Sequence, residues 1–134
     1  MLKIYTEKAP AAIGPYSQGY AVNNFIFTSG QIPVNPETNQ IPDDISAQAE
    51  NSCKNVGAIL DAAGSCFEKV IKTTCYLADM NDFAAFNKAS VLVTALCGAD
   101  LSLTLQNVDV LSVIPFILLI LYCFISLSAN GLHP

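Results

Sequence analysis

The feature that most constrains the fold is the apolar run Phe25-Ile-Phe-Thr28, which leads directly into Ser29, Gly30 and Gln31. Aromatic and β-branched side chains favour extended backbone, and a short run of them between turn residues predicts a strand buried on both faces. Gly30 frees the backbone where this strand ends, so the Ser29 hydroxyl can turn toward a cleft. The run therefore predicts a site at a strand end, with an ordinary exit into a turn as the alternative.

Hydrophobic periodicity predicts two helices and four strands in the first ninety residues. The strands are expected at 3–6, 20–22, 25–29 and 70–77, and the helices at 45–63 and from 83 onward. On the first helix we expect Gln48, Asn55 and Asp61 to face solvent. This order is typical of helices packed on one face of a mixed sheet in an α+β fold. One or two further strands are needed after the second helix, because strand 70–77 would otherwise be an exposed edge.

Charge and cysteine usage exclude several classes of function. The net charge is −5, and all six basic residues are lysines, so no basic surface is available for nucleic acid or for an anionic membrane. The five cysteines form no CxxC pair and the single histidine is His133, which predicts no metal site and no disulfide framework. Isolated thiols and the lack of an apolar signal segment at the start predict a cytoplasmic protein.

Five motifs in the same order resemble the RidA/YjgF family of reactive intermediate/imine deaminases over about residues 2–90. They lie at 13–19, 28–34, 55–64, 70–74 and 81–87. The resemblance implies a chorismate-mutase-like subunit that forms a homotrimer with a cleft between neighbouring subunits. It also implies hydrolysis of small enamines and imines, such as 2-aminoacrylate or 2-iminobutanoate, to 2-keto acids and ammonia, without a cofactor or metal.

The resemblance also implies which residues form the site. Carried over by position, Tyr16, Ser29 and Asn87 would be the catalytic residues. Ser17, Gly30 and Gln31 would bind the substrate. A neutral pocket of this kind can hold a small planar imine and position a water molecule against its carbon.

The chain departs from the family pattern in its last third. The family carries an arginine that clamps the substrate carboxylate and a late glutamate that orients water, but this chain has no arginine and its last glutamate is Glu68. A lysine does not reproduce the bidentate contact of a guanidinium. The sequence therefore predicts an impaired deaminase, with a non-catalytic binding or membrane-anchored protein, or one without function, as the alternative. A single-strand-specific ribonuclease is a third class, which the acidic composition disfavours.

The composition divides the chain into three parts. Residues 1–90 form the RidA-like domain, 91–109 a divergent connector, and 110–129 a charge-free run long enough to span a bilayer as a helix. We expect this apolar, helical tail to take the place of the family's final strands. A membrane anchor, a helix of a soluble core and an altered reading frame or splice all explain the run.

Overall fold

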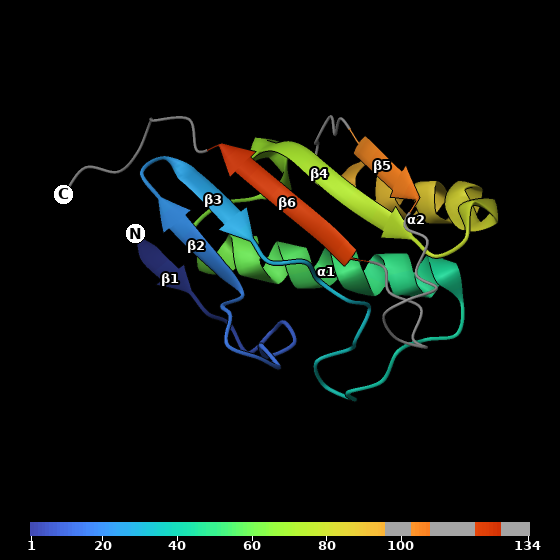
Figure 1. Ribbon diagram of the computed structural model, residues 1–134, viewed down its shortest axis with the longest axis horizontal. Helices are drawn as coiled ribbons and strands as arrows, with labels where there is room; N and C mark the ends of the chain where they lie inside the picture. The colour runs from blue at the N-terminus through green and yellow to red at the C-terminus, as the bar shows by residue number, and fades with distance from the viewer. Residues whose placement is uncertain (96–102, 108–119, 127–134) are drawn as a thin grey trace.

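The computed structural model describes residues 1–95, 103–107 and 120–126 of the 134-residue chain (Figure 1). The elements in chain order are β1 (Leu2–Ile4), β2 (Gly19–Val22), β3 (Phe25–Thr28), α1 (Ile45–Ala62), η1 (Phe67–Lys69), β4 (Val70–Leu77), η2 (Met80–Asp82), α2 (Phe83–Ala95), β5 (Leu103–Asn107) and β6 (Ile120–Ser126). This is the α+β architecture that the hydrophobic periodicity predicts.

The six strands form one sheet in the order β1-β2-β3-β6-β4-β5. Only β4 and β5 pair in parallel, and the other neighbours are antiparallel, so the sheet is mixed as expected. Both helices lie on the same face of the sheet, with α1 running behind the strands in the view of Figure 1. The predicted arrangement of two helices on one face is confirmed.

The expectation that the final strands are missing and replaced by a helical tail is wrong where the structure describes the tail. Residues 120–126 form β6, which pairs with β3 on one side and with β4 on the other. β5 extends the sheet beyond β4. The physical reason is the need stated above for strands that close the sheet, because β3 and β4 each present an edge that an extended apolar segment can satisfy. The rest of 110–129 lies outside the described residues.

Within the described residues, no helix combines the length and the apolar character that crossing a membrane requires. The longest, α1, carries Glu50 and Lys54 on its surface as an ion pair of 2.6 Å. α2 runs from Phe83 to Ala95 and so continues past the predicted domain boundary at residue 90.

Local signals place the ends of α1 and the first hairpin correctly. Asp44 caps α1 by accepting a hydrogen bond from the Ala47 N–H at 2.9 Å. Gly64 follows the helix with a φ of 71°, the left-handed conformation that glycine adopts without strain. In the turn between β2 and β3, Asn23 has a φ of 53°, which asparagine tolerates better than most residues.

The core lies between the sheet and the helices. On β3, Ile26 is fully buried on the helix side, whereas Phe25 and Phe27 are 43% and 39% exposed on the other side. The prediction that this strand is buried on both faces is therefore wrong for the isolated chain, since the helices cover only one face of the sheet.

Two polar residues expected on the solvent face of α1 are buried instead. Asn55 donates from Nδ2 to the carbonyl oxygens of Ile32 at 3.1 Å and Val34 at 2.9 Å, and Gln48 donates to the carbonyl of Pro42 at 2.7 Å. They hold the loop that follows β3 against the helix. Only the third residue of that prediction, Asp61, is exposed. A loop without periodicity gave no sign that its carbonyls need donors from the helix.

Candidate functional site

The end of β3 is bound closely to the residues that precede β2. Beyond the last ladder pair, Gly19 with Thr28, the Ser29 N–H donates to the carbonyl of Gln18 at 2.9 Å. The Ser29 hydroxyl donates to the carbonyl of Ser17. Ser29 is thus fixed by two bonds to consecutive carbonyls. Because a hydroxyl has one hydrogen and two lone pairs, Ser29 is left as a hydrogen-bond acceptor.

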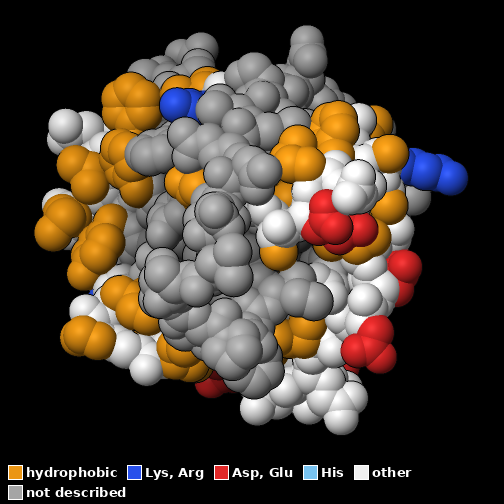
Figure 2. Space-filling model, turned by 45° about the vertical axis from the view of Figure 1, so that its right-hand side comes forward, with side chains coloured by type: hydrophobic (Ala, Val, Ile, Leu, Met, Phe, Trp, Pro, Cys, Tyr) orange, Lys and Arg blue, Asp and Glu red, His pale blue; other side chains and the backbone are white. Residues whose placement is uncertain are grey.

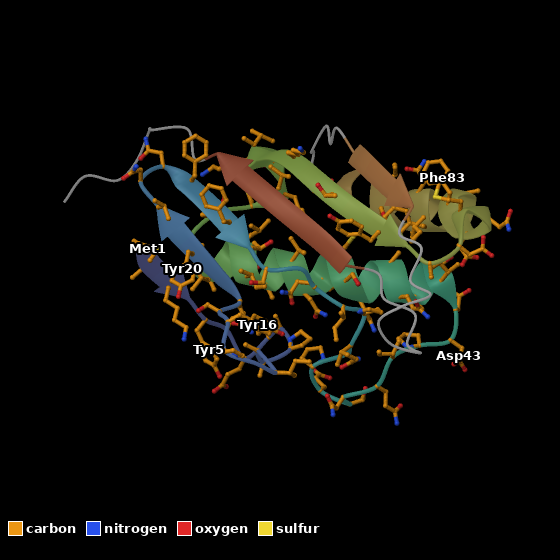
Figure 3. All side chains as sticks on the ribbon, viewed as in Figure 1. Met1, Tyr5, Tyr16, Tyr20, Asp43 and Phe83 are labelled. Carbon is orange, nitrogen blue, oxygen red and sulfur yellow. The ribbon has the colours of Figure 1, made fainter. Side chains whose placement is uncertain are left out.

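Ser17, whose carbonyl accepts from the Ser29 hydroxyl, is buried. Its hydroxyl donates to the phenol oxygen of Tyr20 at 3.0 Å, and Tyr20 lies on the face of the sheet that the helices leave open. Figure 3 shows Tyr20 on β2, with Tyr5 and Tyr16 in the loops near it. Ser17 therefore links the strand end to the open face of the sheet.

Gly30 and Gln31 complete the turn after Ser29. Gln31 is buried, and its Nε2 donates to the carbonyls of Ser29 at 3.1 Å and Gly30 at 3.3 Å. Both amide hydrogens are thus used within the turn, and the remaining capacity of the side chain is its Oε1 acceptor. The structure brings four of the six predicted site residues together: Ser17, Ser29, Gly30 and Gln31.

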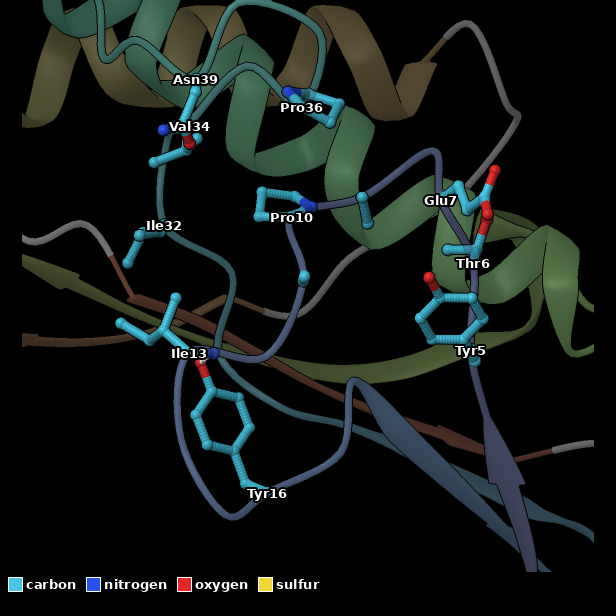
Figure 4. A pocket seen from close by; sticks show the side chains of 12 residues that line it. Tyr5, Thr6, Glu7, Pro10, Ile13, Tyr16, Ile32, Val34, Pro36 and Asn39 are labelled. Atoms are coloured by element: carbon cyan, nitrogen blue, oxygen red, sulfur yellow. Dashed lines mark hydrogen bonds between the residues drawn. The ribbon is translucent and has the colours of Figure 1, made fainter.

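Tyr16 lines a pocket of about 370 Å³ (Figure 4). Its phenol oxygen accepts from the Ile13 N–H at 3.3 Å, which bends the chain through the Gly14-Pro15 turn. The segment 5–16 forms one wall of the pocket and the loop 32–39 the other. The lining residues are Tyr5, Thr6, Glu7, Ala9, Pro10, Ala11, Ile13, Tyr16, Ile32, Val34, Pro36 and Asn39. The lining is mostly apolar, and Glu7 is its one charged residue.

Asn87 is not brought to this group within the chain. It is half-buried on α2, the helix layer, and across the described residues no hydrogen bond joins it to Ser29 or Tyr16.

Among the described residues, Glu7 is the one charged side chain that lines the pocket, and the two buried thiols of the core are inert. In the part of the chain that the structure describes, no group of three or more His, Cys, Asp or Glu residues could hold a metal ion. Burial raises the pKa of Cys53 to about 11 and of Cys75 to about 12. Both are therefore neutral thiols near pH 7 and not nucleophiles.

Sequence reasoning missed Gln18. This buried side chain makes four hydrogen bonds to the segment 6–10, which forms part of the pocket wall. Its only signal in the sequence is its place between Ser17 and Gly19, in the motif 13–19. Nothing in periodicity distinguishes a buried glutamine from an exposed one when it precedes a strand.

The sequence is similar to one protein family and to several curated proteins. The family described as Endoribonuclease L-PSP matches residues 6–97. A 2-iminobutanoate/2-iminopropanoate deaminase of Escherichia coli K12 is 56% identical over 84 residues, which is 63% of this chain and 66% of that protein. A RutC family protein of Haemophilus influenzae is also 56% identical over 84 residues, or 65% of its length. The alignment thus spans just under two thirds of these curated relatives.

Solved structures agree over more of the chain. The E. coli protein TdcF with bound serine has a TM-score of 0.89 at 37% identity and covers 96% of this chain and 100% of its own. The YjgF gene product of E. coli has a TM-score of 0.88 at 39% identity, covering 94% of this chain and 98% of its own. These neighbours share the fold of this chain.

Proposed function

The chain belongs to the Endoribonuclease L-PSP (RidA/YjgF) family, and from this premise we propose that its site binds a small imine or enamine and hydrolyses it. The products would be a 2-keto acid and ammonia. The relative named 2-iminobutanoate/2-iminopropanoate deaminase supports this class of substrate. The alignment with it covers 63% of this chain.

The observation that carries the proposal is the state of Ser29. Its hydroxyl hydrogen is donated to the Ser17 carbonyl, so its two lone pairs are left to accept hydrogen bonds. An acceptor fixed in this way suits an N–H of the substrate or an O–H of the attacking water. Gly30 beside it has no side chain that would block the approach.

The reaction itself needs few groups. An enamine first takes up a proton on its carbon and becomes the imine. The oxygen of water then bonds to the carbon of the C=N bond while a water proton passes to the nitrogen, which gives a carbinolamine. Its hydroxyl proton moves to the nitrogen, the C=O bond forms, and the C–N bond breaks to release ammonia. Ser29 would hold the substrate nitrogen or the water by accepting a hydrogen bond, and the Tyr16 phenol would border the substrate. The contribution of such positioning is to hold the reacting atoms in an attack geometry.

Part of the site would come from a second subunit. We propose a homotrimer in which Asn87 of one chain faces the strand end of its neighbour, since among the described residues of one chain no hydrogen bond joins Asn87 to Ser29. The open face of the sheet supports assembly, since it exposes Tyr20, Phe25, Phe27 and Ile71. Figure 2 shows hydrophobic side chains gathered on the left-hand side of the view and acidic ones on the right.

We further propose that hydrolysis by this chain is slow. It has no arginine to bind the substrate carboxylate, and no glutamate beyond Glu68 to orient water. Loss of such groups costs about 3–4 kcal/mol of transition-state stabilisation for one well-placed donor, which is a factor of about 10² to 10³ in rate.

The test is ammonia and pyruvate release from 2-aminoacrylate generated in situ by another enzyme. We expect a rate above the buffer control but at least about 10²-fold below that of the E. coli deaminase assayed in parallel. The matched variant Ser29→Ala should return the rate to that of buffer. A wild-type rate equal to buffer would overturn the proposed activity.

The absence of arginine favours a second candidate, a subunit that binds keto or imino acids without turning them over. Titration of the labelled protein with 2-oxobutanoate separates the two. Shifts of the Ser29 and Gly30 amide resonances without ammonia release would favour the binding protein. For the deaminase, we expect both shifts and turnover.

A further inference from the structure

Gln18 lies between the segment 6–10, which forms part of the pocket wall, and Ser29 at the end of β3. The side chain is 3% exposed and uses both its amide oxygen and its amide nitrogen. Oε1 accepts from the Thr6 N–H at 2.7 Å, while Nε2 donates to the carbonyl of Thr6 at 2.9 Å. The same Nε2 donates to the carbonyls of Ala9 at 3.2 Å and Pro10 at 2.9 Å.

This two-way bond with Thr6 continues the ladder between β1 and β2. The backbone pairing of these strands ends at Ile4 and Gly19. Thr6 lies two residues beyond Ile4. There the Gln18 side chain, in place of a strand backbone, bonds both the N–H and the carbonyl of Thr6. Without it, the carbonyls of Thr6, Ala9 and Pro10 would lose a shared buried donor, and unpaired buried carbonyls are costly.

The backbone of the same residue holds the other part of the site. The Gln18 carbonyl accepts from the Ser29 N–H at 2.9 Å, and the preceding carbonyl, of Ser17, accepts from the Ser29 hydroxyl. One residue therefore joins the segment 6–10, a wall of the pocket, to the serine at the strand end.

We propose that Gln18 is a positioning residue that couples the segment 6–10 to Ser29. Its side chain fixes the wall, and the same hydrogen bonds fix the backbone of residues 17 and 18, whose carbonyls accept from the Ser29 hydroxyl and from the Ser29 N–H respectively. The catalytic part of this inference rests on the proposed function, whereas the coupling is a property of the fold and is measured separately.

The structural test is amide hydrogen exchange in the full chain carrying Gln18→Met, which preserves the volume and removes the polar atoms. The Thr6 amide loses its acceptor and should exchange at least about tenfold faster. The Ser29 amide keeps its acceptor, so faster exchange there, by several-fold or more, reports the coupling. Unchanged exchange at Ser29 beside faster exchange at Thr6 would overturn it.

Gln48→Met is the matched control, because Gln48 is also 3% exposed and also donates to a loop carbonyl, that of Pro42, which is not among the residues that line the pocket. It should leave the exchange of Thr6 and Ser29 unchanged. If it accelerates both as strongly as Gln18→Met, the effect is general loosening and the proposal fails. If Gln18→Met does not fold, Gln18→Asn, which keeps the amide but shortens its reach, serves in the same comparison.

The activity test uses the 2-aminoacrylate assay. A displaced Ser29 should lower kcat by up to about 10²-fold in Gln18→Met, while Gln48→Met keeps the wild-type kcat. Equal kcat in wild type and Gln18→Met would overturn the positioning role. A wild type without activity would instead refute the proposed function, and the exchange measurement would still decide the coupling.

Discussion

The two faces of the sheet are made by the same strands but meet different surroundings. On the face that α1 and α2 cover, Ile26 and Cys75 are completely buried. On the opposite face, Phe25 and Phe27 remain about two fifths exposed, with ring centroids 6.3 Å apart. The covered face contains all that one chain needs for a core. The open face carries aromatic residues that a single chain leaves partly in water.

Side chains on the covered face therefore act on the folding of one chain, whereas those on the open face are available for contacts between chains. Neighbouring residues of one strand point to opposite faces, so a substitution can be moved from one face to the other by a single step along the chain. The predictions below use that alternation, beginning with the change that should be largest.

Ile26→Ala should cause the largest loss of stability. Ile26 is fully buried, and truncation leaves a cavity between β3 and α1, which costs about 2–5 kcal/mol of unfolding free energy. Urea denaturation followed by far-UV circular dichroism measures the change. The comparison is with Phe27→Ala at equal protein concentration, which removes a larger side chain from the open face. A larger loss for Phe27→Ala at concentrations where the chain is monomeric would break the distinction between the faces.

How much of the fold the sequence predicts depends on how far apart in the chain the interacting residues lie. Local signals sufficed for α1, because Asp44 and Gly64 act on the backbone beside them. The strand pattern of 25–28 revealed an apolar segment, but the face left open depends on which layers the rest of the chain supplies. The run 110–129 contains no charged residue. A buried helix and a buried strand are both compatible with such a composition, so the composition alone could not reveal β6.

The same limit of range applies to the candidate site. Ser17, Ser29, Gly30 and Gln31 lie together because the hairpin brings two short motifs side by side, while their role in a site stays a prediction. Gln18 and Asn55 were missed as partners because their hydrogen bonds cross eight to 23 residues of sequence. Their role depends on loops whose backbone carbonyls must be satisfied by something, and a sequence does not state by which side chain.

The thiols of the covered face should make stability fall at high pH. Burial raises the pKa of Cys53 to about 11 and of Cys75 to about 12, above the ordinary value of 9.0. Below pH 9 both thiols are protonated in the folded and unfolded chains, and the full stability is present. As the pH rises from 9 toward 11, the unfolded chain releases these protons first, at a cost of up to about 1.4 kcal/mol per pH unit for each thiol.

Urea titrations at pH 8, 9.5 and 10.5 measure this slope. The variant Cys53→Ala with Cys75→Ala is the matched control, since it retains every other titrating group. Its stability should fall less steeply than that of the wild type over the same range. Identical slopes would show that water reaches the covered face.

Gly19→Ala probes how tightly the covered face is packed at β2. An added Cβ would lie 2.9 Å from the carbonyl oxygen of Phe27 and 3.4 Å from side-chain carbons of Ile4 and Ile59. Backbone cannot yield as a flexible side chain does, so we expect a loss of about 1–3 kcal/mol. Thermal unfolding measures it. Ala21→Ser, a small change on the same strand where the packing is looser, should cost less, and the reverse order would contradict tight packing at Gly19.

Phe27→Ser should have the smallest effect on the folding of one chain and a clear effect on assembly. The ring is partly exposed and on the face without helices, so we expect a loss of about 1 kcal/mol or less in the unfolding free energy of the monomer. If the open face forms the contact of a homotrimer, a hydroxyl there removes apolar area from three interfaces at once. Sedimentation velocity over a concentration series should then show a trimer for the wild type and dissociation at higher concentrations for Phe27→Ser.

Glu50→Gln on the exposed side of α1, where the ion pair with Lys54 contributes about 0.5 kcal/mol or less, should leave assembly unchanged. A wild type that sediments as a monomer throughout the series would mean that the aromatic face needs a different partner, and the proposal of a site shared between three copies would fall with it.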